Sequence, residues 1–280
     1  MSEIESSTGD VAVTSDRAAD VQWSLGLAFA LIAVPTIIVL TLVFWLLPTP
    51  WWLGVLLGLV IAGVVVWMRA RNADQAVMSS LGGGLLKTDG AARLENLVQG
   101  LSLAGGVEEP QVVVLSDPAR NAMAVRNGGR NRIVVTQGLL QSLEVVELEG
   151  VVAELLTRLK NGDAEAATLG AALFGQPILD GPLRSVLGPV ARMGLGRLLS
   201  ADRDLEADRQ AVRLTRYPPG LHGALRKMGE GDLTPKSVSP GLAHLWLVDP
   251  EHRTRAASVV DDSGSERAPL GLRIDVLAEL

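Results

Sequence analysis

Two uncharged hydrophobic runs dominate the first quarter of the chain. The first extends from Trp23 to Leu47 and the second from Leu53 to Met68. The first exceeds the roughly 20 apolar residues that a helix needs to cross a bilayer, and the second is at the short end of the spanning range. Pro48-Thr49-Pro50 lies between them, and proline ends a helix because it lacks a backbone donor. The pattern predicts a transmembrane helical hairpin over residues 23–68.

The flanks of the hairpin predict its orientation. Five of the six tryptophans lie at or near the ends of the two runs, as in an interfacial aromatic belt. Arg69 and Arg71 follow the second run directly, whereas the connecting turn carries no charge. The positive-inside bias therefore predicts a multi-pass protein of the cytoplasmic membrane, with the lipid bilayer as a partner and with both termini and the main domain in the cytoplasm. Residues 1–22 are polar and acidic without apolar periodicity, so we expect a disordered tail there.

The rest of the chain alternates between two periodicities. Helix-period apolar positions predict helices over residues 85–103, 139–159, 202–216 and 269–280. Short β-branched or apolar runs predict strands over residues 111–115, 123–125 and 133–135, the last two joined at Asn127-Gly128-Gly129. Gly82-Gly83-Gly84 predicts a flexible joint within a linker over residues 69–92. We therefore expect an α+β fold, with a mainly helical domain and a small sheet over residues 93–280.

Composition excludes several classes of protein. The chain has 280 residues and no cysteine, which excludes disulfides and thiolate metal sites. The net charge is −6, and no basic cluster resembles a nucleic-acid surface. None of His222, His244 and His252 forms an i, i+4 pair, so we interpret them as surface or packing residues. Charges and prolines interrupt residues 164–199, and we predict helices there that pack on the domain or lie at the membrane surface.

Several short motifs occur in a characteristic order from about Arg93 to the C-terminus. They are Pro110-Gln111-Val112-Val113-Val114-Leu115, Asn121-Ala122-Met123-Ala124, Thr136-Gln137-Gly138-Leu139-Leu140, Val151–Asp163 and Asp204-Leu205-Glu206-Ala207-Asp208. In this order they resemble the HtpX-like and CAAX-prenyl-protease-like membrane zinc metallopeptidases. The resemblance implies a zincin-type domain behind the membrane hairpin.

The resemblance also locates a degenerate active site. The family's zinc helix reads His-Glu-x-x-His, in which both histidines bind zinc and the glutamate activates the metal-bound water. Here the histidine positions hold Glu154 and Arg158, the base position holds Leu155, and Asp204 stands at the third ligand. An arginine stays protonated and cannot bind a cation. We therefore expect no catalytic residue, no metal ligand and no cofactor.

Two functions remain open at this point. One is a pseudoprotease that binds peptides or membrane proteins, for which the resemblance offers the edge strand Asn121, Ala122, Met123, Ala124 and Val125. The alternative is an active zinc-dependent membrane endopeptidase in protein quality control. Glu154 and Arg158 have the spacing of a helical ion pair. Arg158 could bridge Glu154 and Asp204 in place of a metal, or these residues could form a solvated face.

Overall fold

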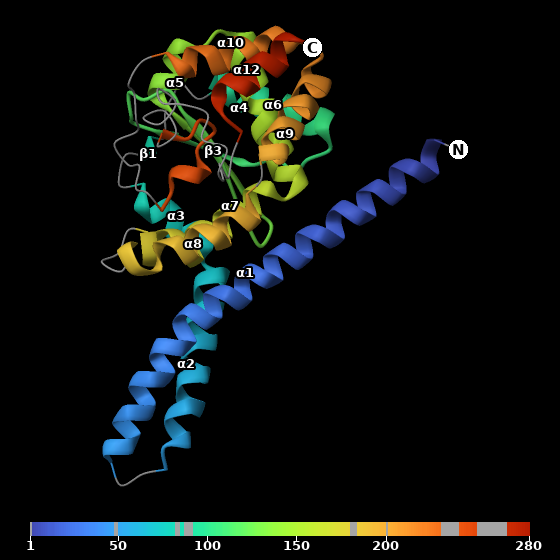
Figure 1. Ribbon diagram of the computed structural model, residues 1–280. Coiled ribbons are helices and arrows are strands. Elements are labelled where there is room, and N and C mark those ends of the chain that lie inside the picture. The colour runs from blue at the N-terminus through green and yellow to red at the C-terminus, as the bar shows by residue number, and fades with distance from the viewer. Residues whose placement is uncertain are drawn as a thin grey trace.

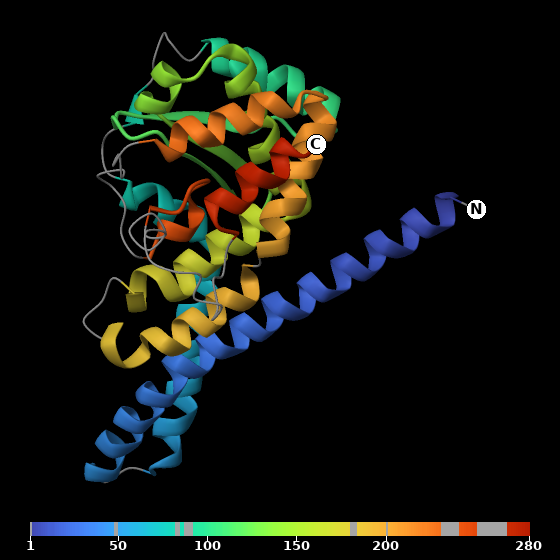
Figure 2. The ribbon, with the colours of Figure 1, turned by 45° about the horizontal axis from the view of Figure 1, so that its top comes forward.

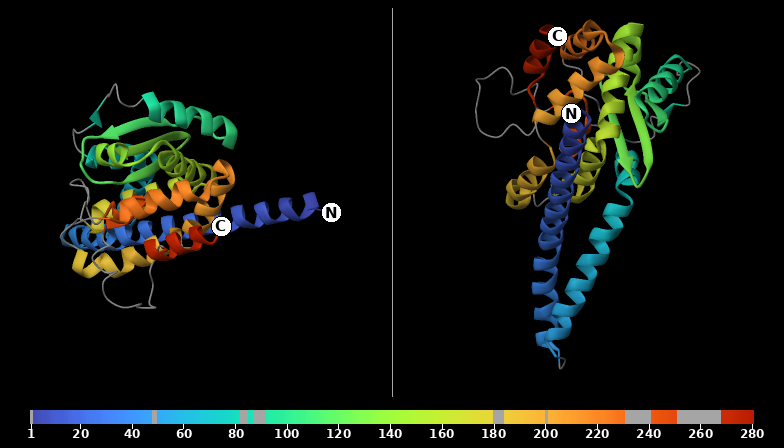
Figure 3. Two further views of the ribbon diagram at one scale, coloured as in Figure 1. Left: turned by 90° about the horizontal axis from the view of Figure 1, so that it is seen from above. Right: turned by 90° about the vertical axis from the view of Figure 1, so that its right-hand side faces the viewer.

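Two long helices at the N-terminus, each with a long apolar stretch, project from the rest of the chain in the computed structural model (Figures 1 and 3). They are α1, Ser2–Leu46, and α2, Trp52–Arg71. The structure describes residues 2–47, 50–81, 85–86, 92–179, 184–199, 201–230, 241–250 and 268–280. The prediction of an α+β protein with an N-terminal pair of apolar helices is confirmed.

The outer surface of the hairpin is apolar. Large side chains such as Ile38, Leu42 and Val60 are exposed. In the most apolar parts of α1 and α2, only 11% and 22% of the residues are buried inside the protein, so neither is a core helix of a soluble domain. Both are long and apolar enough to cross a membrane.

The two helices approach closely along a stripe of small residues. Gly54, Gly58 and Ala62 lie one turn apart on the buried face of α2. A Cβ atom on Gly54 would lie 2.8 Å from backbone atoms of Leu40 and Thr41. Small residues at such positions let two membrane helices pack backbone to backbone.

The start of α1 differs from the sequence prediction. The helix begins at Ser2, where we expected a disordered tail over residues 1–22. Extending an existing helix needs no new nucleus, and the Ala, Glu and Arg residues of this stretch are acceptable helix formers. Pro48 and Thr49 of the connecting turn lie outside the described residues.

The segment after α2 belongs to the body of the protein. α3 (Ala73–Ser80) buries Val77 in a core cluster with strands of the sheet. β1 (Leu85–Leu86) pairs with the second strand of the sheet. The helix predicted over 85–103 is therefore α4, Ala92–Gly105, and its first two predicted residues pair as a strand instead. The predicted joint Gly82-Gly83-Gly84 lies outside the described residues.

The sheet follows the predicted strands closely. β2 (Gln111–Leu115), β3 (Ala122–Asn127) and β4 (Arg130–Thr136) join β1 in the order β1-β2-β4-β3. β2 is parallel to β4, and β3 is antiparallel to β4. Gly128 and Gly129 have φ angles of 56° and 82°, which the two-residue turn between β3 and β4 requires and which glycine adopts without strain.

Helices cover the sheet and build the core (Figure 2). After β4 come α5 (Gln137–Ser142), α6 (Val145–Asn161), α7 (Asp163–Gly170), the π-helical segment η1 (Ala171–Leu179), α8 (Arg184–Leu198), α9 (Ala201–Thr215), α10 (Pro218–Gly229), the 3₁₀ turn η2 (Ala243–Leu245) and α12 (Leu270–Ala278). α6 is central, because it contacts β3, α4, α9 and α10. A capping box between Glu144 and Glu147 starts α6.

The turn between β3 and β4 holds the end of the membrane hairpin. The side-chain amide of Asn127 donates to the carbonyls of Ala70 and Arg71, both at 3.0 Å. Arg130 and Arg132 bind the fully buried Asp74 at 2.8 and 2.6 Å. Burial alone would raise the pKa of Asp74, but these hydrogen bonds and charges hold it below its usual value. The hairpin is thus attached to the sheet before the chain reaches residue 82.

Candidate functional site

Arg158 lies between two carboxylates from two helices. On α6, its Nε atom donates to Glu154 Oε1 at 2.6 Å. Its Nη2 atom donates to Oδ1 of Asp204 on α9 at 2.8 Å. The predicted bridge is therefore confirmed in its contacts. The alternative of a solvated face does not describe these residues, because the side chains of Glu154 and Asp204 are 0% and 6% exposed and that of Arg158 is 13% exposed.

A second arginine completes the cluster. Arg273 on α12 binds Asp208 through two parallel hydrogen bonds, of 2.8 and 2.6 Å, which is the strongest geometry for this pair. It also donates to Glu154 Oε1 at 3.2 Å and to the carbonyl of Leu247 at 2.9 Å. We did not predict a role for Arg273 or Asp208. The available signal was spacing, because Asp208 lies one helical turn after Asp204.

The cluster brings three carboxylates against two guanidinium groups in a buried place. Burial raises the pKa of Glu154, and this effect exceeds the lowering by the charges of Arg158 and Arg273. Burial alone would lower the pKa of both arginines, but the neighbouring carboxylates raise it above the usual value. Glu154 Oε2 is buried and has no hydrogen-bond partner in the part of the chain that the structure describes.

Several relatives of this chain carry the name protease HtpX homologue. The chain is 30% identical over 224 residues to a protease HtpX homologue of Dictyoglomus turgidum, an alignment that covers 69% of this chain and 74% of the relative. It is 29% identical over 223 residues to the homologue of Dictyoglomus thermophilum, covering 70% and 74%. It is 33% identical over 188 residues to that of Tropheryma whipplei strain Twist, covering 58% and 64%.

The chain belongs to the HtpX family. No protein-family model matches it, and no solved structure matches it either.

The residues that the resemblance matches to the family's zinc ligands do not fit zinc. Zinc in such a site needs lone pairs from neutral histidines and a carboxylate, whereas Arg158 and Arg273 place two permanent cations against Glu154. Oε1 of Glu154 and Oδ1 of Asp204 already accept hydrogen bonds from the Arg158 guanidinium. Within the described residues, no group of three His, Cys, Asp or Glu side chains could hold a metal ion.

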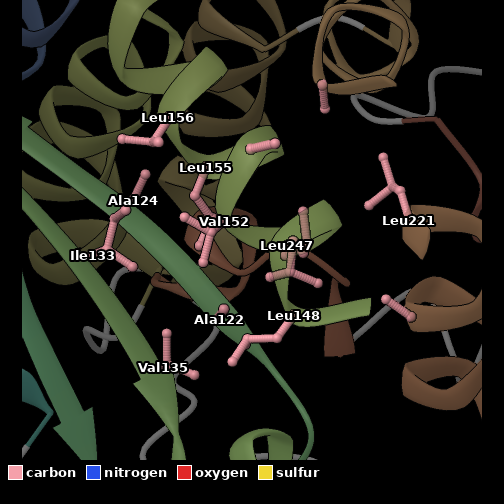
Figure 4. Close-up of a cluster of buried hydrophobic side chains, with 14 of the residues drawn as sticks. Ala122, Ala124, Ile133, Val135, Leu148, Val152, Leu155, Leu156, Leu221 and Leu247 are labelled. Carbon is pink, nitrogen blue, oxygen red and sulfur yellow. The ribbon is translucent and has the colours of Figure 1, made fainter. Parts of the chain in front are cut away.

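The base position of the HtpX-like pattern is part of the hydrophobic core. Leu155 is fully buried and lies among Val152, Ala124 and Leu247 (Figure 4). A water molecule at this place would have no polar partner on Leu155, and the side chain cannot take a proton. The fully buried Leu156 belongs to the same core cluster, so Leu155 lies on an apolar face of α6.

The edge strand of the HtpX-like pattern is covered by the chain itself. Asn121 to Val125 are all buried. The amide of Leu247 donates to the carbonyl of Ala122 at 2.7 Å, and Met123 forms a bridge with Trp246. Asn121 exchanges two hydrogen bonds with the backbone of Val248, at 2.6 and 3.1 Å. An extended peptide could join β3 here only if residues 245–248 moved away.

Proposed function

We propose that this protein is a membrane-anchored, non-catalytic member of the HtpX family, a pseudoprotease that binds proteins rather than cleaving them. The observation that carries the proposal is the position of the Arg158 guanidinium between Glu154 and Asp204. At this place the family resemblance puts a zinc ion. One cation held by two anions joins α6 to α9, so the arginine takes over the structural part of the metal's role and none of its Lewis acidity.

The chemistry of proteolysis lacks its other parts as well. Leu155 offers no base to activate water, and it is enclosed by apolar side chains. Leu247 fills the space beside β3 (Figure 4). The relatives are named as proteases, which favours the alternative of an active zinc-dependent membrane endopeptidase in protein quality control. Metal content separates the two functions.

The deciding experiment is metal analysis of the full chain purified in lipid nanodiscs. We expect no stoichiometric zinc and no cleavage of an unfolded protein substrate. The matched control restores the family's ligands and base with Glu154→His, Leu155→Glu, Arg158→His and Asp204→Glu in one variant, which we expect to bind zinc if it folds. About one zinc per chain in the unaltered protein would overturn the proposal, whatever the control does.

The proposed location is the cytoplasmic membrane, with both termini and the body of the protein in the cytoplasm. Arg69 and Arg71 at the end of α2 support this orientation, as does the cation–π contact of Arg71 with Trp67 at 5.3 Å, which suits an interface. A fluorescent reporter that folds only in the cytoplasm, fused after Leu280, tests it. Activity of a phosphatase that works only outside the cytoplasm at the same site would contradict it.

The proposed partners are membrane proteins or extended peptides, and β3 is the candidate surface once residues 245–248 are displaced. Leu247→Pro removes the N–H that binds the carbonyl of Ala122, and Leu247→Ile keeps it. We expect a fluorescent peptide of alternating Val and Thr to bind the Pro variant more tightly than the Ile variant in an anisotropy titration. Equal binding by the two variants would remove this edge from the proposal.

A further inference from the structure

One face of α8 is firmly packed. Ala191, Gly194 and Leu195 are buried. A Cβ atom on Gly194 would lie 2.7 Å from the ring of Phe174, so only glycine lets α8 lie this close to η1. The same cluster contains Ala28 of α1 and Val66 of α2. The inner face of α8 is therefore fixed against both η1 and the hairpin.

The opposite face of α8 is apolar and uncovered. Val186, Pro189 and Met193 are spaced by three and four residues, which places them on one side of a helix. Val186 is 70% exposed and Met193 is 56% exposed. Ser185 and Arg192 are exposed beside this stripe. A helix with one packed face ordinarily exposes polar residues on the other face. We therefore expect the apolar stripe of α8 to contact an apolar environment rather than water.

The level of α8 along the hairpin indicates which medium this is. The hydroxyl of Ser24 donates to the carbonyl of Gly194 at 3.4 Å, and Ser24 lies in the first turn of the candidate membrane span Gln22–Leu46. Leu25, Phe29 and Ile32 of the same span pack against the cluster that holds α8. At the end of the other helix, Arg69 donates to the carbonyl of Ala172 in η1 at 3.4 Å. Figures 1 and 2 both show α8 across the junction between hairpin and body.

We propose that α8 is an interfacial membrane helix, and that Val186, Pro189 and Met193 insert into the phospholipid leaflet around the base of the hairpin. The packed face of α8 lies on the base of the hairpin, and the outer side chains of the hairpin are apolar and exposed, which makes lipid the occupant. Arg192 on α8 and Arg71 at the end of α2 are exposed and suit the phosphates of the headgroups. The chain thus contacts the bilayer with an in-plane helix as well as with its two candidate spans.

The chain has no cysteine, so a single introduced cysteine is the one site that a thiol-reactive dye can label. Single variants Val186→Cys and Met193→Cys of the full chain are labelled with an environment-sensitive nitrobenzoxadiazole dye and reconstituted in phosphatidylcholine–phosphatidylglycerol vesicles. Leu42→Cys reports the hairpin. Leu103→Cys on α4 is the matched control, because Leu103 is apolar and 80% exposed. Arg192→Cys reports the polar side of α8. Quenching is measured with nitroxide-bearing lipid and with aqueous iodide.

We expect the lipid-borne quencher to lower the emission of the labels at 186 and 193 by at least about twofold, as at Leu42, because an interfacial helix buries its apolar face below the headgroups. Iodide should quench the label at 103 most and the label at 192 more than that at 193. Strong iodide quenching at 186 and 193, as at 103, would overturn the proposal. Protection of both labels from both quenchers would also overturn it and indicate a protein contact. Either result leaves the proposed pseudoprotease function untouched, because that function is tested by metal content.

Discussion

Removing Arg158 should destabilise the body of the protein strongly. In Arg158→Ala, Glu154 and Asp204 lose the cation that lies 2.6 and 2.8 Å from them. Breaking a buried ion pair from one side costs about 3–5 kcal/mol, because a charge is left without compensation. We expect the lower end of that range, since Glu154 keeps Arg273 at 3.2 Å and Asp204 keeps the amide of Ala268 at 3.1 Å.

The matched control is Arg209→Ala on α9. Arg209 pairs with Glu206 at 3.8 Å, and both side chains are 44% exposed, so its loss should cost less than about 1 kcal/mol. Thermal unfolding of the full chain in nanodiscs, followed by tryptophan fluorescence, measures both variants. A change of 1 kcal/mol shifts the midpoint by about 2–4 °C in a chain of this size. Arg158→Ala should therefore lower the midpoint by roughly 6–12 °C.

A triple variant tests the electrostatic reason. Combining Glu154→Ala, Arg158→Ala and Asp204→Ala removes the two stranded carboxylates with the arginine, so part of the lost stability should return. If Arg158→Ala unfolds like the parent and the triple variant is no more stable than the single one, the cluster does not hold the helices together. The idea that an arginine replaces the metal structurally would then be refuted.

Three further predictions concern Asp74, Glu154 and two glycines of the hairpin. Asp74→Asn should lower the unfolding midpoint at neutral pH, and the difference from the parent should vanish as the pH falls through the lowered pKa of Asp74, because a carboxylate with a depressed pKa stabilises only while it is ionised. Glu154 has a raised pKa, so the parent should lose stability relative to Glu154→Gln as the pH rises above about 4.5, and a constant difference across a pH series would contradict this. Gly54→Ala should force α1 and α2 apart and lower the free energy of unfolding by about 1–3 kcal/mol. Gly63→Ala should be neutral, because its Cβ would meet only the ring of Phe29, at 3.9 Å. Similar unfolding midpoints for the two variants would argue against close packing of the helices.

The sequence predicts local structure well where one physical effect dominates. The turn at Gly128 and Gly129 follows from backbone freedom, and the membrane helices follow from their long uncharged runs. The bridge from Arg158 to Glu154 follows from i, i+4 spacing. The contact with Asp204 followed from the family resemblance, because nothing in the local pattern joins α6 to α9.

The missed features depend on contacts between distant segments. Arg273 lies 65 residues from its partner Asp208 in the sequence, and an arginine on a short amphipathic helix resembles a solvated residue. The pairing of Leu247 with Ala122 is equally non-local, so the edge strand looked open. Leu85 and Leu86 fit a helix by periodicity, but pairing with β2 decides their structure. In each case the chain's long-range packing overrides the local pattern.

Asn127 and Arg130 bind the last turn of α2, and Arg130 and Arg132 bind Asp74 on α3, so the body of the protein is attached to the hairpin at several points. A hairpin in a thicker or thinner membrane changes its tilt to keep its apolar length covered. Because the β3–β4 turn is bound to the last turn of α2 and to Asp74, the sheet must tilt with it. The body of the protein would then move together with the hairpin as one unit and keep one face turned to the membrane.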